Sequence, residues 1–310
     1  MASAPGDGTP RGKTIPLAPS FPLVNPPASQ LGLRNAVYSG RGRRHDSGEV
    51  PGWLSIKAMA AGSATWETRE RQFVVDENSY LVLNDDHRYA LRFHSDTPVT
   101  TFVLFFRRGL AEDALRCDTT GGSRLLDNPA DTRAQAEFFE RLETRTSPLF
   151  GMIHAFRKRV AAGLDADAAE DWFVRIVDRM VRDQLDAQRG MTRLPAVRAS
   201  TRAELFRRVL RGRDFLFSQA GERATLGDAA RAACLSPFHF HRAFKQAFRE
   251  TPHQALTRYR LERAASMLSR GERVTDVCLA SGFESLGTFS SLFRRFHGTS
   301  PRDYRKAQGK

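Results

Sequence analysis

The sequence has few cysteines and no long hydrophobic run. Its three cysteines, Cys117, Cys234 and Cys278, stand apart, and none belongs to a C-x-x-C pair. We therefore expect neither a disulfide framework nor a zinc site, and a reducing compartment fits. The longest apolar strip, Phe102 to Phe106, is far too short to cross a bilayer, and the N-terminus lacks the apolar core of a signal peptide. We expect a soluble, cytoplasmic protein with no membrane contact.

Acidic residues are scarce in the last third of the chain. Of the 310 residues, 48 are Lys or Arg and 35 are Asp or Glu, which gives a net charge of +13. Residues 200–310 contain 21 basic and 10 acidic residues, whereas residues 49–199 contain 21 and 23. A concentrated positive charge is what a surface that binds phosphates requires. The near-neutral middle is typical of a module that contacts small molecules or other proteins.

One pattern occurs twice in this basic region. Residues 226–248 match residues 274–296, with an offset of 48 before an internal turn and 49 after it. In each copy a short segment of small residues precedes a segment with two aromatic residues four positions apart. These pairs are Phe240/Phe244 and Phe289/Phe293. The spacing predicts two helix-turn-helix units, each with a second helix held in place by its aromatic pair.

The remaining face of each second helix is free to enter a major groove of DNA. Its polar residues are His239, His241, Arg242 and Lys245 in the first copy, and Thr288, Ser290, Ser291, Arg294 and Arg295 in the second. Between the copies, residues 252–270 are predicted to form one amphipathic helix, capped by Thr251 and with Pro252 in its first turn. A helix of this length spans roughly 28 Å, close to the spacing of about 34 Å between successive major grooves.

These residues resemble the AraC/XylS family of bacterial transcriptional regulators over about residues 201–308. The similar strings are LSPFHFHRAFKQAF (235–248), RLERAASML (260–268) and VCLASGFESLGTFSSLFRRFHGTSPRDYR (277–305). The resemblance implies a sequence-specific regulator that binds double-stranded DNA, with RNA polymerase as a further partner. It implies base contacts by Phe238, His241, Arg242, Leu286, Gly287, Ser290 and Ser291. We assign phosphate or auxiliary contacts to His239, Lys245, Thr288, Arg294 and Arg295.

The sequence departs from the family pattern at three positions. Cys234 stands in the first turn where glycine is usual, and Arg249 stands where a glycine often follows the first reading helix. A side chain with a Cβ is costly there if the backbone is left-handed. Ser291 occupies a position where arginine is frequent, so the second unit lacks that fork for guanine. We expect the first unit to supply most of the sequence specificity and the second mostly grip.

The chain before this region is predicted to contain an arm and a β-rich part. Residues 1–48 include seven prolines and end in the basic cluster Arg41, Arg43 and Arg44, which predicts a disordered arm. From 51 to about 110, short β runs alternate with polar turns, one of them at 94–98. The runs are 53–59, 72–75, 80–83, 89–93 and 99–106. They predict an antiparallel meander closed into a small barrel or sandwich, and the resemblance implies a cupin-like sensor.

Three residues of this barrel are the first candidates to contact a small-molecule effector. Tyr89, Leu91 and Phe93 alternate along one run and so share one face. Ordinary core packing of this face is the alternative.

Helices are predicted over residues 131–188. The first apolar stripe contains Ala134, Phe138 and Leu142, and the second contains Leu149, Ile153, Phe156 and Val160. The third is the broad face at 172–185, for which we expect core packing against the barrel, with a homodimer contact as the alternative. Residues 189–200 are predicted as a linker to a DNA-binding domain at 201–310.

The sequence shows no pattern of an enzyme site. A metal-dependent cupin needs converging histidines, typically an H-x-H pair, and none occurs. His87 and His94 are seven positions apart, which would place them on opposite faces of a continuous strand. A Gly-rich phosphate loop and a Ser-His-Asp context are also missing. We therefore expect no catalytic residue, no cofactor and no metal.

The sequence as a whole predicts a multidomain α+β protein. An N-terminal antiparallel barrel with helices (49–188) precedes an all-α domain with two helix-turn-helix units joined by a linking helix. The function expected is transcriptional regulation, controlled by a ligand or by dimerisation. A cupin-type enzyme with a DNA-binding appendage and an architectural DNA binder without sequence preference remain the alternatives.

Overall fold

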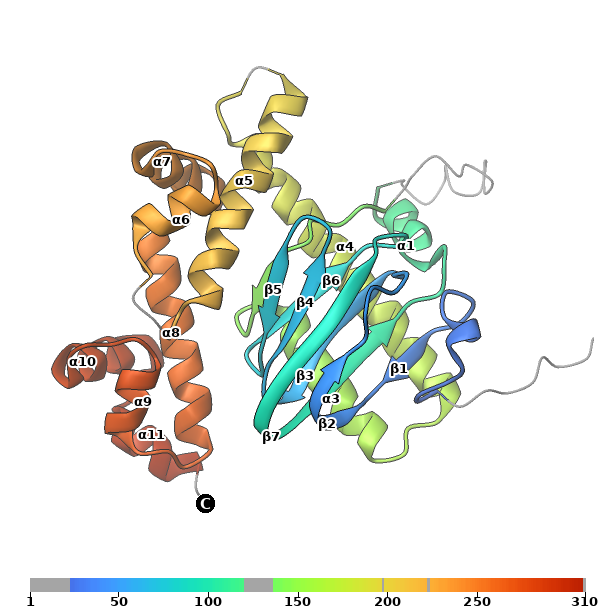
Figure 1. Ribbon diagram of the computed structural model, residues 1–310, viewed down its shortest axis with the longest axis horizontal. Helices are drawn as coiled ribbons and strands as arrows, with labels where there is room; N and C mark the ends of the chain where they lie inside the picture. Colours follow the sequence, from blue (N-terminus) through green and yellow to red (C-terminus); the bar gives the residue numbers. More distant parts are fainter. Residues whose placement is uncertain (1–22, 120–135, 197, 222–223, 309–310) are drawn as a thin grey trace, which may run out of the picture.

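The computed structural model describes residues 23–119, 136–196, 198–221 and 224–308. An eight-stranded antiparallel sheet curls into a barrel in the N-terminal part, and the C-terminal part is helical. Figure 1 shows the two parts side by side, with α5 (Ala199–Ser218) between the sheet and the remaining C-terminal helices. The predicted α+β architecture is confirmed.

The sheet is built around its longest strand, β7. Its strand order is β5-β4-β7-β3-β6-β8, and β1 and β2 also pair with β7. All paired strands are antiparallel. The strands are β1 (Ala36–Tyr38), β2 (Arg41–Asp46), β3 (Ser55–Ala61), β4 (Ala64–Thr68), β5 (Gln72–Val75), β6 (Ser79–Leu83), β7 (Tyr89–Phe105) and β8 (Leu142–Thr144).

The central strands β3 and β6 are buried on both faces, and each face contributes to a different core. In β3, Ile56 and Ala58 belong to the core that the sheet forms with the N-terminal helices, whereas Met59 belongs to the core inside the barrel. Successive residues of a strand point to opposite faces, so this division follows from the strand itself. Coverage on both sides explains why all five residues of β6 are buried.

The prediction of two strands separated by a turn at 94–98 is wrong, because β7 runs unbroken from Tyr89 to Phe105. Its first half pairs with β4 and its second half with β3. The register against β2 shifts between Gly42, which faces Val99, and Arg44, which faces His94. Pro98 lies within this shifted stretch. A proline without an N–H is tolerated at such an irregularity because no ladder hydrogen bond is needed there.

The predicted disordered arm is also wrong for its described part. From residue 23 onward the chain forms a 3-10 turn, η1 (Ala28–Gln30), followed by β1 and β2. Val37 of β1 is buried, and its N–H donates to the carbonyl of Leu23 at 2.9 Å. The basic cluster lies exposed on β2. The proline count is misleading because most of these prolines precede residue 23, outside the described residues.

The helices of the N-terminal part are α1 (Leu110–Thr119), α3 (Pro148–Ala161) and α4 (Ala166–Thr192). The helical stripe predicted to begin at Ala134 is wrong: Leu142 lies in β8, the buried Phe138 is in irregular structure, and Ala134 is outside the described residues. Polar tertiary contacts replace helical ones there, since the Phe138 N–H donates to the Asn84 side chain at 2.8 Å. Leu149, Ile153 and Phe156 are buried on α3, as predicted.

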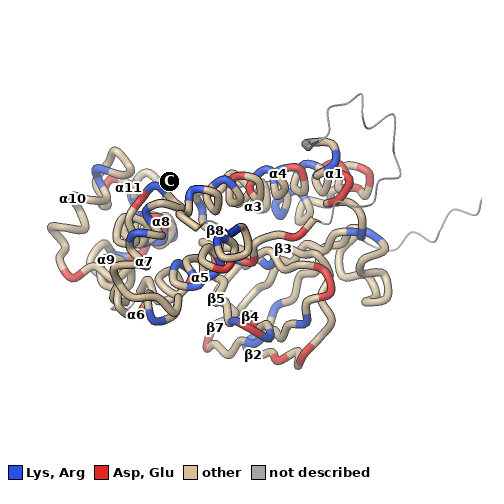
Figure 2. The backbone as a smooth tube through the Cα atoms, turned by 90° about the horizontal axis from the view of Figure 1, so that it is seen from above, with Lys and Arg blue, Asp and Glu red and all other residues tan. Residues whose placement is uncertain are grey.

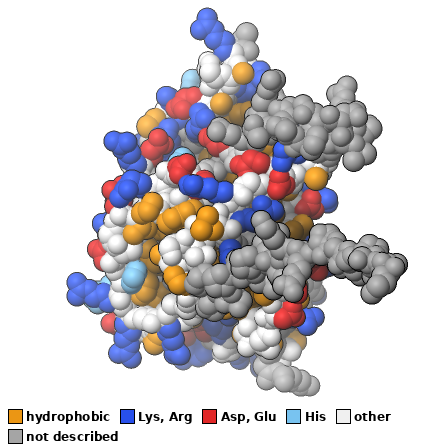
Figure 3. Space-filling view, turned by 90° about the vertical axis from the view of Figure 1, so that its right-hand side faces the viewer, with side chains coloured by type: hydrophobic (Ala, Val, Ile, Leu, Met, Phe, Trp, Pro, Cys, Tyr) orange, Lys and Arg blue, Asp and Glu red, His pale blue; other side chains and the backbone are white. Residues whose placement is uncertain are grey.

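The broad apolar face of α4 is core. Phe173, Ile176, Val177, Met180 and Val181 are all buried in the core that α3 and α4 share with the sheet. A homodimer through this face would have to expose them, so this version of the dimer prediction is disfavoured. Val174, on another face of α4, is exposed. Figure 3 shows further hydrophobic side chains gathered on the side of the molecule that lies at the right of Figure 1, among charged ones.

The linker in the structure is shorter than the predicted linker at residues 189–200. Helix α4 continues to Thr192, and α5 begins at Ala199. Gly190 serves packing rather than flexibility, because a Cβ on it would approach the carbonyl oxygen of Ala247 to 3.1 Å. Glycine in this helix therefore allows α4 to approach the C-terminal helices closely.

The predicted C-terminal architecture is confirmed. After α5 come α6 (Leu226–Ala232), α7 (Pro237–Phe248), α8 (Pro252–Ser269), α9 (Val274–Ala280), α10 (Leu286–His297) and α11 (Pro301–Gln308). The sequence repeat is a structural repeat: α6 and α9 have 7 residues each, and α7 and α10 have 12. Thr251 caps α8 as predicted, in a capping box with Gln254. No described helix combines the length and apolar character that crossing a bilayer requires.

Candidate DNA-binding surface and sensor

The two helix-turn-helix units use the same backbone with different residues. We call α6 with α7 the first unit and α9 with α10 the second unit. In the second unit, Gly282 (φ 81°) and Gly298 (φ 76°) adopt the left-handed conformation at the turn and after the reading helix. At the matching positions of the first unit, Cys234 (φ 52°) and Arg249 (φ 60°) adopt it too. The turn is thus not rebuilt around Cys234, and the first unit retains this backbone strain.

The reading helix α7 is anchored by its aromatic pair. Phe240 and Phe244 are buried, with ring centroids 5.6 Å apart. Ser236 caps the helix by accepting a hydrogen bond from the His239 N–H at 3.3 Å. The predicted contact residues lie on the outer side: Phe238, His239, Arg242 and Lys245 are exposed, and His241 is half-buried. Phe238 is 71% exposed, which is unusual for so large an apolar side chain.

The reading helix α10 has the same construction. Phe289 and Phe293 are buried, again 5.6 Å apart. The predicted contact residues Leu286, Gly287, Thr288, Ser291, Arg294 and Arg295 are exposed, and Ser290 is half-buried. A shallow, open depression between the outer face of α10 and the start of α11 is lined by Ser290, Ser291, Arg294, Arg295, Gly298 and Ser300.

The basic side chains of both reading helices are available to phosphates. Within the described part of the chain, no acidic residue forms an ion pair with Arg242, Lys245, Arg294 or Arg295. Figure 1 shows α7 and α10 on the side of the C-terminal part away from the sheet, with α8 running from one to the other. Figure 2 shows basic residues on α10 and α11 at the end of the molecule remote from the sheet.

The first unit is joined to the N-terminal part through α5, which packs against α6 and α7 and makes buried polar contacts with the barrel. Asp214 of α5 forms an ion pair with Arg71, and its Oδ1 accepts a hydrogen bond from the Leu142 N–H at 3.3 Å. The neighbouring Arg213 donates to the Leu142 carbonyl. Burial raises the pKa of Asp214, although Arg71 and Arg213 oppose this shift.

Apolar contacts reinforce this attachment. The rings of Phe139 and Phe206 lie 4.9 Å apart across the boundary. A single apolar core extends from the barrel interior through Leu142 and Phe206 to Phe240 and Phe244. The first unit and the barrel are therefore packed as one body.

The second unit has a core of its own. Phe289 and Phe293 pack with Leu261, Leu268 and Val277 in a separate cluster. Across the described residues, no hydrogen bond or ion pair links α9 or α10 to the sheet. The nearby connections are made by α8 and the residue after it: Arg263 pairs with Asp76 at 3.7 Å, and the half-exposed Arg270 pairs with Glu77 at 3.0 Å.

The candidate ligand residues of the barrel lie in the first half of β7. Tyr89 belongs to the core inside the barrel, and the partly buried Leu91 and Phe93 pack against it. Tyr89 is buried, and desolvation with the nearby Tyr38 raises its pKa to about 12. Phe93 stacks on His45 at 5.6 Å. This geometry is compatible with a wall that contacts a bound ligand and equally with ordinary packing of a hydrophobic core.

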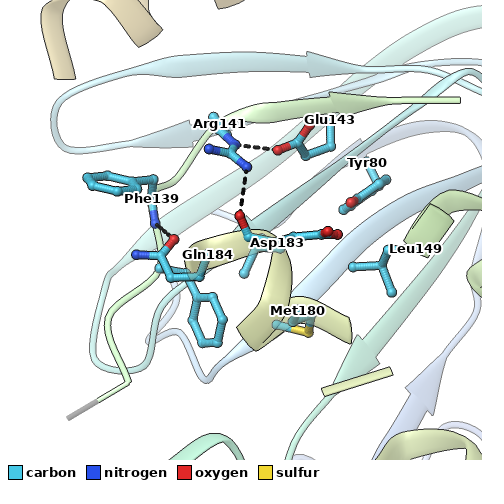
Figure 4. Close-up of a pocket in the computed structure, with 10 residues that line it drawn as sticks. Tyr80, Phe139, Arg141, Glu143, Leu149, Met180, Asp183 and Gln184 are labelled. Atoms are coloured by element: carbon cyan, nitrogen blue, oxygen red, sulfur yellow. Dashed lines mark hydrogen bonds and ion pairs between the residues drawn. The ribbon is translucent and has the colours of Figure 1, made fainter. Parts of the chain in front are cut away.

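A small pocket lies outside the barrel interior (Figure 4). No sequence motif predicts a site at this position. Its lining residues come from β6, β8, α3, α4 and the segment before β8, and they include Tyr80, Phe139, Arg141, Glu143, Asp183 and Gln184. Burial raises the pKa of Glu143, but Arg141 and Arg213 overcome this and lower it. The cavity has a volume of about 20 Å³, which is room for about one water molecule.

The two histidines of the barrel lie apart from each other. His87 is exposed, with its Nδ1 at 2.6 Å from Glu140, and His94 is exposed on β7. Among the described residues, no three His, Cys, Asp or Glu side chains form a group that could hold a metal ion.

Comparison with known proteins agrees with this geometry. A helix-turn-helix domain model matches residues 229–307, and a model of the AraC-like ligand binding domain matches residues 37–157. Together they cover both the reading units and the barrel. The chain belongs to the AraC/XylS family.

Individual relatives of this family member match over the DNA-binding region. The HTH-type transcriptional activator RhaS of Escherichia coli is 42% identical over 69 residues, which are 22% of this chain and 25% of the relative. The HTH-type transcriptional regulator ArgR of Pseudomonas aeruginosa is 35% identical over 85 residues, 27% of this chain and 26% of the relative. This chain thus spans only about a quarter of the length of these curated relatives.

Solved structures show a distant likeness. The C-terminal domain of AraT, a response regulator from Geobacillus stearothermophilus, is 27% identical with a TM-score of 0.31, covering 32% of this chain and 84% of that one. ToxT from Vibrio cholerae is 11% identical with a TM-score of 0.34, covering 88% of this chain and 98% of that one.

Proposed function

We propose that this protein is a sequence-specific, DNA-binding transcriptional regulator. The observation that carries the proposal is the structural repeat: two reading helices of equal length, each with an exposed polar outer face, are joined by one linking helix. A helix of this construction fits a major groove, and the length of α8 suits two successive grooves. The family membership and the basic C-terminal third support the same function.

We assign the base contacts to the residues that the family pattern implies. In α7 these are Phe238, His241 and Arg242, and in α10 they are Leu286, Gly287, Ser290 and Ser291. Arg242 has the planar fork that recognises guanine, and Phe238 has an apolar ring suited to a thymine methyl group. His239, Lys245, Thr288, Arg294 and Arg295 are assigned to phosphates or auxiliary contacts.

Selection from a random DNA pool tests this function. The purified full chain is expected to enrich a motif with two half-sites about one helical turn apart. A mixed pool with no enriched motif at physiological salt would favour the architectural DNA binder instead. Competition with scrambled duplexes gives the specificity ratio, which separates reading of sequence from electrostatic attraction.

The barrel is assigned the role of sensor for a small-molecule effector. Its match to the AraC-like ligand binding domain and its buried aromatic interior support this role. A homodimer, contact with RNA polymerase and a cytoplasmic location remain predictions that accompany a regulator of this kind. Sedimentation of the full chain with and without its operator measures the first of them.

The rival function is an enzyme of cupin type with a DNA-binding appendage. Relatives in this family are named as transcription regulators, which favours a protein without catalysis. Metal analysis of the purified protein decides between the two. A stoichiometric metal bound to the N-terminal part would support the enzyme.

A further inference from the structure

Lys57 is a buried ammonium group for which the structure shows no partner. It lies in β3, opposite Leu81 of β6 and Val103 of β7, and it is 0% exposed. Its Nζ forms no hydrogen bond with any described residue. The groups that the structure places against it are the faces of two rings: Nζ lies 3.9 Å from the ring centroid of Tyr89 and 4.5 Å from that of Phe105.

More aromatic rings surround these two. Tyr38 and Trp53 pack edge-on against Phe105, with centroids 5.4 Å and 6.4 Å away. Unlike Lys57, Tyr38 and Trp53 are half-buried. The cluster therefore reaches solvent at these two rings, and we place the entrance of the site there.

Lysine is an expensive choice at this position. An unpaired ammonium loses its hydration on burial, and contact with ring faces restores only part of it. Burial accordingly lowers the pKa of Lys57 well below its usual range, with no charged neighbour contributing to the shift. A methionine of similar length would fill the same space without this cost. The residue makes sense if an anion reaches it from solution and completes its pairing.

The surroundings define the chemistry of this anion. Lys57 is a single positive charge, whereas phosphate recognition generally uses several donors. Leu81 lies directly opposite Lys57 in the neighbouring strand, and the core inside the barrel to which Leu81 belongs also contains Met59, Trp66 and Phe73. A sugar needs many polar partners, which these residues cannot supply. The Tyr89 hydroxyl stays protonated at neutral pH, because its pKa is raised to about 12, and so remains a donor.

We propose that the barrel binds a small monocarboxylate with an apolar body, whose carboxylate pairs with Lys57 while its body lies among Tyr38, Trp53, Tyr89 and Phe105. This inference rests on the sensor role proposed above and names its ligand class. Binding requires Tyr38 and Trp53 to turn aside, since they lie between the buried rings and solvent.

Titration calorimetry of the full chain with two acids and their amides tests the proposal. Benzoate and octanoate represent aromatic and aliphatic bodies, and benzamide and octanamide keep each body without the charge. At least one carboxylate is expected to bind at least about tenfold more tightly than its amide, as a charge-assisted hydrogen bond implies. Absence of binding by both carboxylates, or equal binding of acid and amide, overturns the proposal.

Substitutions assign the preference to Lys57. Lys57→Met and Lys57→Gln are expected to reduce the preference for carboxylate over amide to near unity. Lys158→Met is the matched control, because Lys158 is exposed on α3 and its substitution removes the same charge away from the barrel. Wild-type affinity for the carboxylate in either Lys57 variant overturns the assignment.

Two further measurements distinguish failure of the ligand proposal from failure of the proposed regulator function. Without ligand, Lys57→Met is expected to melt at or above the wild-type temperature, and failure of this variant to fold contradicts the premise of an unpaired ammonium. The same preparations are used for selection of DNA sequences. If the DNA motif is enriched but no carboxylate binds, the ligand class is wrong and the regulator function stands.

Discussion

The two helix-turn-helix units share one backbone but differ in what holds them. The first unit is continuous with the barrel through a common apolar core and through the buried Asp214 contacts. The second unit has a separate core, and its connection to the sheet runs through α8, by the ion pairs of Arg263 with Asp76 and of Arg270 with Glu77. We therefore expect a change inside the barrel to act more directly on the first unit than on the second.

This difference matches the division of labour proposed for DNA binding. The unit fixed to the sensor also contains Arg242, the residue best suited to read guanine. The loosely attached unit contains serine at the corresponding surface and two exposed arginines, Arg294 and Arg295, for phosphates. In a regulator of this form, a conformational change in the barrel would be transmitted to the unit that determines DNA sequence specificity.

The largest expected effect is on the attachment of the first unit. Asp214→Ala leaves Arg71 without its carboxylate and leaves the buried Arg213 with only Glu143, at 3.9 Å. Breaking a buried pair in this way typically costs about 3–5 kcal/mol. Arg270→Ala removes the half-exposed contact with Glu77 and is expected to cost about 0–1 kcal/mol. Urea denaturation of both variants measures the difference. Equal losses would mean that the two units are attached to the sensor with similar strength.

The next effect concerns reading and grip. Arg242→Ala is expected to weaken binding to the selected operator by about 1–3 kcal/mol and to relax the preference at one base, with little change on scrambled DNA. Arg294→Ala should weaken binding to both duplexes alike and make the salt dependence shallower, because a phosphate contact is lost. Ser291→Ala should change little on either duplex.

Titration of each variant against both duplexes over a salt series decides the assignment. Equal losses on operator and scrambled DNA for Arg242→Ala would show that α7 grips rather than reads. The two units would then not differ in the way their attachment suggests.

A smaller effect is expected from the left-handed backbone positions. Cys234→Gly should raise the free energy of unfolding by up to about 1 kcal/mol, since it removes the strain of a Cβ at φ 52°. Gly282→Ala at the matching turn should lower it by more, because its Cβ would come within 2.4 Å of the Ala220 carbonyl oxygen. Thermal unfolding of both variants provides the test. Destabilisation by Cys234→Gly would show that the cysteine side chain has a compensating contact.

The helices of the C-terminal part could be predicted from the sequence because the internal repeat and the local helix signals agreed. Both helix-turn-helix units and α8 followed from aromatic spacing and from the capping pattern at Thr251. Prediction failed where distant contacts decide the structure. Pro98 lies within a strand because β2 is irregular opposite it, and Leu142 forms a strand because β6 pairs with it.

The candidate sites show the same limit. The outer faces of α7 and α10 follow from helical periodicity alone, and all predicted contact residues there are exposed or half-buried. The sequence does not indicate that Lys57 is buried. A single lysine within an apolar run is also the pattern of a strand residue that faces solvent. The significance of Lys57 depends on four rings that come from β1, β7 and the segment before β3.

The smallest expected effect is a pH dependence confined to the second unit. The repeat pairs His297 with Phe248, so the second unit has a titratable ring where the first has an apolar one. His297 is half-buried between Phe293 and Tyr304, with ring centroids 4.4 Å and 5.4 Å away. Desolvation lowers its pKa below 6.5. The hydrogen bond with the Leu261 carbonyl opposes this shift, and the nearby positive charge of Arg145 adds to it.

A lowered histidine pKa means that the unfolded chain binds the proton more readily than the folded unit. The stability of the second unit should therefore be full above about pH 6.5 and should decrease as the pH falls through the folded pKa. His297→Phe copies the first unit and should remove this decrease, whereas His253→Gln, at an exposed position on α8, should leave it unchanged. Hydrogen exchange of amides in α7 and α10 between pH 7 and pH 5, corrected for the intrinsic rates, measures both units in one sample. Loss of protection in α7 and α10 to the same extent would show that the two units unfold together, against the separate cores on which the comparison rests.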